Sequence, residues 1–214
     1  MAIFFQHSIN QSTKLGIWKI EEPEQFFLEK VPLRQTVTHP YKRLQHLAGR
    51  LLLPELFNDF PLAEIMIADT RKPFLEDDLY HFSISHCGNF AAAIASSEQR
   101  VGVDLELITP RLKLIAHKFL TEPEKKYLDN WQYLPALYLQ MLTILWCSKE
   151  AIFKWYGSGN VDFRGHMVLD GAIVFQPDQW IRVPFVFQKS EAVKLIVSAR
   201  TFDGLVLAYV VTER

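Results

Sequence analysis

The sequence is poor in cysteine, in net charge and in long apolar stretches, and each shortage excludes a class of protein. Its two cysteines, Cys87 and Cys147, lack metal-ligand spacing, which favours reduced thiols in a cytoplasmic protein. The net charge is −1, so no global field would recruit nucleic acid or an acidic membrane. No apolar run reaches the roughly 18 residues of a membrane span. The N-terminus lacks the basic start and apolar run of a signal peptide.

What the sequence does contain is typical of a globular protein with a sizeable core. It has 214 residues, of which 49% are hydrophobic and 22% are charged, enough for one large domain or two small ones. Turn signals and periodicity predict strands over 15–20, 63–68, 80–85, 90–96, 100–107, 167–175, 180–187, 192–200 and 205–212. Helices are predicted over 21–28, from 38 to a stop at Pro54, over 110–128 with a fresh start at Thr121, and over 135–156. Strands and helices occur in both halves, which indicates an α+β fold.

The predicted helix from Pro135 has two faces. Its apolar stripe consists of Tyr138, Met141, Leu142, Leu145, Ile152 and Tyr156, and its polar stripe consists of Gln140, Thr143, Cys147, Glu150 and Lys154. Gly157 and Gly159 would end this helix. Glu150 and Lys154 are four residues apart and should project side by side. A surface ion pair is the common explanation, but the aromatic residues around them predict burial, where charges need a partner or a task.

Acidic residues also share one side of a predicted strand. Side chains alternate along R-V-G-V-D-L-E-L, so Asp104 and Glu106 lie on the same side as Gly102. An ordinary half-exposed strand explains this pattern too. Like charges on one face nevertheless repel unless a cation lies between them. Two carboxylates with a third from elsewhere would suit Mg²⁺, which keeps waters and phosphate oxygens as further ligands.

Taken in order, four motifs resemble the 4'-phosphopantetheinyl transferase superfamily. V-G-V-D-L-E is followed some forty residues later by W-C-S-K-E-A-I-F-K, and S-I-S-H and R-K-P lie upstream, as in the larger single-chain, pseudo-dimeric branch. H-L-A-G-R-L-L-L resembles the N-terminal helix of that branch. The resemblance covers roughly residues 34 to 160. It implies two similar halves, 1–100 and 101–214, each a small antiparallel sheet packed with helices, with the active site between them.

The resemblance implies a reaction and its participants. Coenzyme A would donate its 4'-phosphopantetheine arm to a serine of an apo acyl or peptidyl carrier protein, with adenosine 3',5'-bisphosphate released, as in a holo-[acyl-carrier-protein] synthase. By the same resemblance, Asp104, Glu106 and Glu150 would hold Mg²⁺. Glu150 would act as the base, Lys154 would stabilise the departing phosphate, and Lys149 would have a lesser role. Glu124 competes with Glu150 for an assisting role. The pseudo-dimer implies a monomer.

The remaining roles concern binding. Arg71, Lys72, Ser85 and His86 match positions that hold the phosphates of coenzyme A in the family, and Arg34 corresponds to a further phosphate-binding arginine. Carrier proteins are acidic helical bundles, so the docking surface should be basic and apolar. The candidate residues for it are Lys113, Lys118, Lys125 and Lys126, although a solvated helix face explains them as well.

Two other functions remain open from the sequence. One is a homologue that binds coenzyme A or a carrier protein without turnover, against which the presence of Asp104, Glu150 and Lys154 argues. The other is a metal-dependent phosphohydrolase that uses the same acidic cluster. The absence of a metal-type histidine cluster and of a second acidic pair argues against that function.

Overall fold

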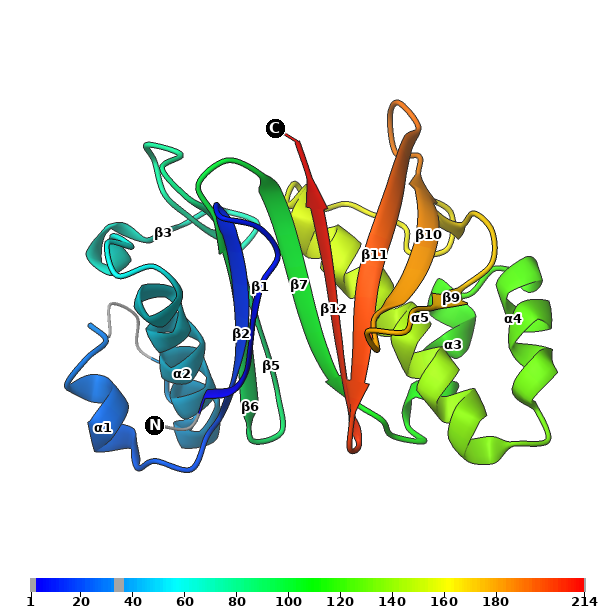
Figure 1. Ribbon diagram of the computed structural model, residues 1–214, viewed down its shortest axis with the longest axis horizontal. Helices are drawn as coiled ribbons and strands as arrows, with labels where there is room; N and C mark the ends of the chain where they lie inside the picture. The colour runs from blue at the N-terminus through cyan, green and yellow to red at the C-terminus, as the bar shows by residue number, and fades with distance from the viewer. Residues whose placement is uncertain (1–2, 33–36, 214) are drawn as a thin grey trace.

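The computed structural model describes residues 3–32 and 37–213 and shows two large antiparallel sheets side by side, besides a small two-stranded one (Figure 1). The chain completes the first sheet before it begins the second. Helices cover the side of each sheet that faces away from the other sheet. The α+β class and the packing of antiparallel sheets against helices are therefore confirmed. The division into domains at residue 100 stays a prediction, although the last strand of the first sheet ends at Ser96.

The first sheet has the strand order β1-β2-β6-β5. Its strands are β1 (Ile3–Ser8), β2 (Thr13–Lys19), β5 (His81–Cys87) and β6 (Phe90–Ser96). Helix α2 (Pro40–Leu56) packs across it, beside the short helix α1 (Glu24–Leu28). Between α2 and β5 lie the 3-10 turn η1 (Leu62–Glu64) and the two-residue strands β3 (Met66–Ile67) and β4 (Pro73–Phe74), which pair with each other.

The second sheet has the order β7-β12-β11-β10-β8, with β9 also paired to β10. Its strands are β7 (Arg100–Leu107), β8 (Met167–Leu169), β9 (Val174–Phe175), β10 (Ile181–Phe187), β11 (Val193–Phe202) and β12 (Leu205–Thr212). Its helices are α3 (Leu112–Phe119), α4 (Glu122–Leu128), the 3-10 turn η2 (Asp129–Trp131) and α5 (Pro135–Tyr156). None of the helices in the described part of the chain combines the length and the apolar character needed to cross a membrane.

The two sheets meet where β5 lies beside β7. Strand β5 is the edge of the first sheet and β7 is the edge of the second, and no backbone ladder joins these two strands. Serine hydroxyls take its place: the Val103 and Leu105 amides each donate to one, 3.2 Å away, on Ser83 and Ser85 respectively. An apolar core also fills the space between the sheets, with residues such as Ile17 from the first half. The alternating serines of S-I-S-H therefore join the two halves beside the expected site.

Helix α5 lies unusually close to β7 because of Gly102. A Cβ added there would stand 2.2 Å from the Ala151 carbonyl oxygen and 2.6 Å from the Trp155 amide nitrogen. Real Cβ contacts are never that short, so only glycine fits. Val101, Val103 and Leu105, on the opposite face of β7, enter the core between the sheets, whereas Leu107 at the end of the strand is exposed.

Most predicted elements are present, and the differences have local causes. Strand β1 was not predicted. The predicted stop at Pro54 is wrong, because α2 continues to Leu56 with the proline inside its last turn. The predicted strand 63–68 contains the end of the turn η1 followed by the two-residue strand β3, and 167–175 is two short strands separated near Gly171, whose φ is +123°. Strand β5 runs on through His86 and Cys87 to a turn at Gly88, φ +47°.

Candidate active site

The centre of the site is an ion pair between helix α5 and strand β7. Lys154 Nζ lies 2.6 Å from Asp104 Oδ1, and the Asp104 side chain is only 4% exposed. The sequence predicted that Lys154 would project beside Glu150, one helical turn earlier, but the ammonium is paired across the two elements instead. Desolvation lowers the pKa of Lys154, yet the Asp104 carboxylate more than offsets it, so the pKa lies above its usual value. Residues fifty positions apart thus meet in one site.

The polar stripe of α5 faces the sheet rather than solvent. Thr143 and Cys147 are fully buried, and the Cys147 thiol lies 3.6 Å from the Val206 carbonyl oxygen. Burial, with Asp104 and Glu106 nearby, raises the pKa of this thiol well above its usual value. Cys147 is therefore an inert structural thiol beneath the charged residues.

Ser85 joins this cluster from strand β5. Its hydroxyl donates to Asp104 Oδ1 at 2.8 Å and accepts from Lys154 Nζ at 2.7 Å and from the Leu105 amide. One donor and two acceptor positions are all that a serine hydroxyl offers. The hydroxyl that was predicted to contact a phosphate is thus fully engaged in holding Asp104 and Lys154, and a phosphate contact by Ser85 stays a prediction.

The charge of Asp104 changes the pKa values of the other two predicted carboxylates, Glu106 and Glu150. Burial and the proximity of Asp104 raise the pKa of Glu150 to about 7. The same two causes raise the pKa of Glu106 to about 7, although its carboxylate accepts a hydrogen bond from Trp146 Nε1 at 2.9 Å. Each carboxylate disfavours the charge of the others, as expected of acids that share a site. The pKa values of Glu106 and Glu150 therefore both depend on the charge of Asp104.

Asp104 and its neighbouring carboxylates could hold a hard divalent cation, for two reasons. Asp104 Oδ2 is buried and has no hydrogen-bond partner in the described structure, although such atoms are normally satisfied. Carboxylate oxygens are the donors that Mg²⁺ prefers, and it binds through one or two of them plus phosphates and waters. Within residues 3–32 and 37–213, no three histidine, cysteine or acidic side chains are grouped closely enough to hold a metal alone. A complete protein cage is therefore absent there, whereas a site completed by phosphate oxygens fits.

A cavity of about 220 Å³ opens beside this cluster, and we call it the Lys154 cavity. Arg71 and Lys72 of the R-K-P turn line it together with Lys154 and Ser83. The turn is tight, since Arg71 adopts the left-handed φ of 65°, which is rare for a residue with a side chain. The structure thus brings the basic turn and the α5 lysine to the same cavity. Arg34 lies outside the described residues.

Sequence reasoning missed His46 of helix α2, which lies near the predicted residue His86. His86 lies at the end of β5, where burial and the Lys154 ammonium lower its pKa. Near it, on α2, His46 has its pKa lowered to about 4 by burial, by Arg50 and by His86. His46 Nε2 is buried without a hydrogen-bond partner in the described structure. The residue belongs to H-L-A-G-R-L-L-L, but nothing in that motif distinguishes a site histidine from a packed one.

The structure also gives Lys149 and Glu124 a different place from the one predicted. Lys149 Nζ lies 2.8 Å from Glu124 Oε2, and both side chains are at most 1% exposed. The ammonium also donates to the Phe119 and Phe163 carbonyls. Glu124 accepts from the amides of Thr121, in a capping box, and of Leu169. Each oxygen of this carboxylate accepts at least one hydrogen bond, so Glu124 joins α4, α5 and β8, and its assisting role in proton transfer stays a prediction.

Comparisons with known proteins agree with this arrangement. The family model of the 4'-phosphopantetheinyl transferase superfamily matches residues 100–210, slightly more than half of the chain. A 4'-phosphopantetheinyl transferase AcpT of Escherichia coli O157:H7 is 34% identical over 128 residues, which cover 58% of this chain and 64% of that protein. Enterobactin synthase component D of Salmonella austin is 31% identical over 124 residues, 58% of this chain and 51% of that protein.

The chain thus spans less than two thirds of the length of these relatives. The matched region nevertheless contains strand β7 with both of its carboxylates and helix α5 with Glu150 and Lys154. On this match, the chain belongs to the 4'-phosphopantetheinyl transferase superfamily.

Proposed function

We propose that the protein transfers the 4'-phosphopantetheine arm of coenzyme A to a serine of an apo acyl or peptidyl carrier protein. The observation that carries the proposal is that Lys154, which is paired with Asp104, and the R-K-P turn line one cavity. The names of the relatives, which include a 4'-phosphopantetheinyl transferase, support the same reaction class. Adenosine 3',5'-bisphosphate would be the second product.

Bond making and breaking in this reaction are confined to phosphorus and oxygen. The carrier serine oxygen attacks the β-phosphorus of coenzyme A, and the bond from that phosphorus to the bridging oxygen breaks. The serine proton needs an acceptor, for which we propose Glu150, directly or through water. Glu150 lies on the polar stripe of α5, one helical turn before Lys154, and a positioned carboxylate is a common general base. The nucleophile belongs to the partner, so no serine or cysteine of this chain needs activation.

Lys154 is proposed to stabilise the departing phosphate. Its ammonium has three hydrogen-bond donors, and two of them reach Asp104 and Ser85. The third remains for a phosphate in the cavity that Lys154 lines. Because Asp104 keeps Lys154 charged and Ser85 fixes its position, the positive charge is already in place when the leaving group develops its negative charge.

Mg²⁺ is the cofactor we propose. Asp104, Glu106 and Glu150 would hold it together with waters and phosphate oxygens, because the described carboxylates are not grouped closely enough to hold a metal by themselves. When bound, it would neutralise charge on the pyrophosphate. The unsatisfied Asp104 Oδ2 supports a cation on that side of the carboxylate, opposite the Lys154 contact at Oδ1. Arg71, Lys72, His86 and Arg34 are proposed to bind the phosphates of coenzyme A.

The docking surface is proposed to include helix α3. Lys113 and Lys118 are exposed on it, and between them Leu114 is 74% exposed. This combination of basic and apolar side chains suits an acidic helical partner. On α4, Lys126 is exposed and Lys125 is paired with Glu122. The monomeric state and a cytoplasmic location remain predictions.

One experiment separates the proposed transfer from its two alternatives. The protein is incubated with coenzyme A, Mg²⁺ and an apo carrier protein, and the carrier is weighed by mass spectrometry. A gain of one phosphopantetheine supports transfer. Tight binding of coenzyme A without a gain would indicate a binding protein instead. Release of free phosphopantetheine without a carrier would indicate a phosphohydrolase.

The Glu150→Gln variant tests the proposed base. Loss of a general base typically lowers the rate by a factor of about 100 or more. We therefore expect that loss in kcat, with the far-UV circular dichroism unchanged because the substitution is isosteric. Glu122→Gln, at an exposed carboxylate of α4, is the matched control and should leave kcat unchanged. Near-normal turnover of Glu150→Gln would remove Glu150 from the mechanism.

A further inference from the structure

One side of strand β7 faces helix α5, and every residue on that side contacts the helix. Because side chains alternate along a strand, this side consists of Arg100, Gly102, Asp104 and Glu106. The glycine lets the helix backbone approach, and the two carboxylates bond to a lysine and a tryptophan of the helix. Arg100, at the start of the strand, completes the row and reaches the end of the helix.

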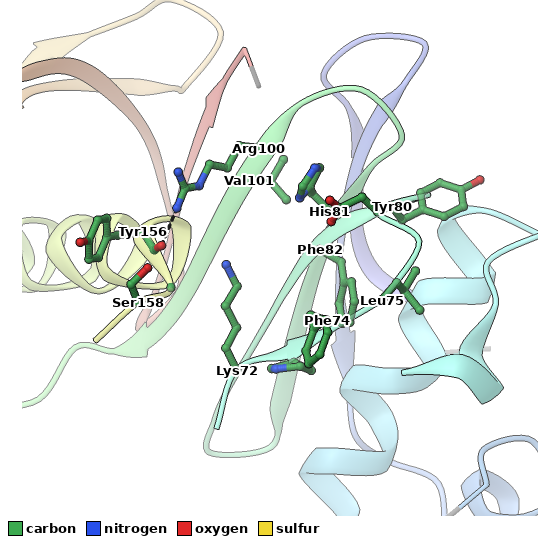
Figure 2. A pocket seen from close by; sticks show the side chains of 13 residues that line it. Lys72, Phe74, Leu75, Tyr80, His81, Phe82, Arg100, Val101, Tyr156 and Ser158 are labelled. Carbon is green, nitrogen blue, oxygen red and sulfur yellow. Dashed lines mark hydrogen bonds between the residues drawn. The ribbon is translucent and has the colours of Figure 1, made fainter. Parts of the chain in front are cut away.

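The Arg100 guanidinium binds the last turn of α5 through three contacts. Its Nε donates to the Trp155 carbonyl at 2.9 Å, and one Nη donates to the Tyr156 carbonyl, as Figure 2 shows. Its central carbon lies 4.6 Å from the centroid of the Trp155 ring. One planar group thus stacks on the indole and satisfies two of the carbonyls that a helix leaves without partners at its end.

A second strand holds the same tryptophan from the side chain. Trp155 Nε1 donates to Thr212 Oγ1 at 3.0 Å. Thr212 is the partner of Arg100 in the ladder between β7 and β12, so the two residues are cross-strand neighbours. Trp155 itself is buried. We call Arg100, Trp155 and Thr212 the Trp155 clamp, since its backbone and its indole are each held by one of the two strands.

The clamp lies directly beside Lys154 in the chain. Lys154 belongs to the last turn of α5, three residues before Gly157, whose φ of +74° ends the helix. Helix ends fray, because their last carbonyls lack partners within the helix. A frayed last turn would carry the lysine away from Asp104. Fixing the next residue, Trp155, prevents this movement.

We infer that Arg100 is a positioning residue for the proposed reaction. By fixing the last turn of α5, it keeps the Lys154 ammonium on Asp104, with the remaining donor available to the Lys154 cavity. The inference rests on the proposed function for its effect on the reaction rate. Its effect on Lys154 itself does not depend on that function.

Direct binding of substrate by Arg100 is the alternative to be separated from this role. Arg100 lines a second cavity, of about 480 Å³, which also contains Lys72 (Figure 2). Thr212 lines neither this cavity nor the Lys154 cavity. A substitution of Thr212 therefore loosens the clamp without touching a surface that substrate could reach in either cavity.

Three variants form the test. Arg100→Lys keeps the positive charge beside Lys72 but replaces the planar fork, so stacking on the indole and the paired carbonyl bonds are lost. Thr212→Val has nearly the same shape and removes the acceptor of the indole N–H. Arg182→Lys, the same substitution at an exposed position of β10, is the matched control and should leave every measurement unchanged.

The first measurement is hydrogen exchange of the Lys154 ammonium, followed by NMR of the full chain labelled with ¹⁵N-lysine, without coenzyme A or carrier. Two hydrogen bonds slow this exchange in the unsubstituted protein. Arg100→Lys should speed it about tenfold and Thr212→Val a few fold, the sizes expected of a charged and a neutral hydrogen bond. The buried ammonium of Lys149, also on α5, is the internal reference and should not change. Loss of one signal in Lys154→Arg assigns the resonance.

The second measurement is the kinetics of transfer to an apo carrier protein. A displaced Lys154 should lower kcat by about tenfold in Arg100→Lys, because small misplacements of a catalytic group are costly. Thr212→Val should lower kcat in the same direction. The KM for coenzyme A should stay unchanged in both variants, since neither removes a proposed phosphate contact.

Three results would overturn the inference. The first is unchanged ammonium exchange at Lys154 in both variants. The second is equal acceleration at Lys149 and Lys154, which would indicate general loosening of α5. The third is a raised KM for coenzyme A in Arg100→Lys with kcat unchanged, which would make Arg100 a substrate contact. If the unsubstituted protein shows no transfer at all, the proposed function fails while the exchange measurement still decides the role of Arg100.

Discussion

At the scale of single residues, the protein contains two lysine–glutamate pairs of similar length in opposite surroundings. Lys149 and Glu124 are 2.8 Å apart and fully buried, whereas Lys125 and Glu122 are 2.6 Å apart on the surface of α4. Removing one partner of a buried pair leaves the other charge without compensation, while a surface pair contributes little. These pairs therefore separate the effect of burial from that of contact distance.

We predict that Lys149→Met lowers the free energy of unfolding by about 3–5 kcal/mol, since Glu124 would remain buried without its partner. Lys125→Met, the surface counterpart, should change it by no more than about 1 kcal/mol. Urea unfolding followed by circular dichroism measures both. Equal effects in the two variants would contradict the structural role assigned to the buried pair.

The second prediction at this scale concerns pH and His46. The unfolded chain takes up a proton on this histidine near pH 6.5, whereas the folded protein does so only at about pH 4. Between these values the unfolded state binds more protons, so the stability contribution present above pH 6.5 is lost as the pH falls towards 4. The slope from one such group is at most about 1.4 kcal/mol per pH unit.

Substitution of His46 by glutamine should therefore flatten the dependence of unfolding free energy on pH between 6.5 and 4. Replacing the exposed His117 by glutamine serves as the control and should leave the slope unchanged. Urea titrations at several pH values give the slope. If His46→Gln keeps the full slope of the unsubstituted protein, His46 is not held neutral in the folded state.

At the scale of the elements, catalysis in the proposed function depends on how closely α5 lies against β7. Gly102→Ala would place a methyl group into the Ala151 carbonyl, and because that atom is backbone, the helix itself would have to move. We expect destabilisation by about 1–3 kcal/mol, typical of overpacking. We also expect at least a tenfold loss of transfer activity, because a shifted α5 displaces Lys154 from Asp104.

Gly16→Ala on β2 is the comparison for this prediction. The tightest contact of its added methyl group would be the end of the Leu52 side chain, at 3.2 Å, which can move, and the next atoms, on Leu56 and Phe5, are at ordinary contact distances. Transfer activity and urea unfolding of both variants give the test. A crystal structure of Gly102→Ala with α5 in its original position would contradict the argument.

The elements also show what sequence alone can predict. Local signals were sufficient for α5, which begins at Pro135 and ends at Tyr156 before Gly157, and for the fresh helix start at Thr121, which is the N-cap of α4. They failed for Pro54, because the Phe57 amide still bonds the Leu53 carbonyl although proline has no N–H of its own. They also failed for β1, because its residues alone do not show that it pairs with β2.

The site was predicted to a similar extent. The motifs identified Asp104, Glu150 and Lys154, and periodicity placed each on the correct element. The ion pair between Lys154 and Asp104 was not predictable, because local spacing favours Glu150 as the partner of Lys154, and Asp104 approaches only in the folded chain. The same reason explains Lys149, whose partner Glu124 lies 25 residues earlier and was considered for a different role.

At the scale of the whole molecule, the proposed active site depends on both sheets. Ser85 and the R-K-P turn come from the first half of the chain, and Asp104 and Lys154 come from the second. Relative movement of the sheets would therefore change the cluster and both cavities together, since Lys72 lines each of them.

The contact between β5 and β7 has a consequence for taking the protein apart. The chain passes from one sheet to the other once, through residues 97–99, and side-chain hydroxyls and apolar packing provide the rest of the contact. Fragments 1–97 and 98–214, produced in the same cell, should therefore reassemble without a peptide bond between them, and an affinity tag on one should retrieve the other. Under the proposed function, labelling of a carrier protein should return only when both fragments are present, because Ser85 and the R-K-P turn belong to one fragment and Asp104 and Lys154 to the other.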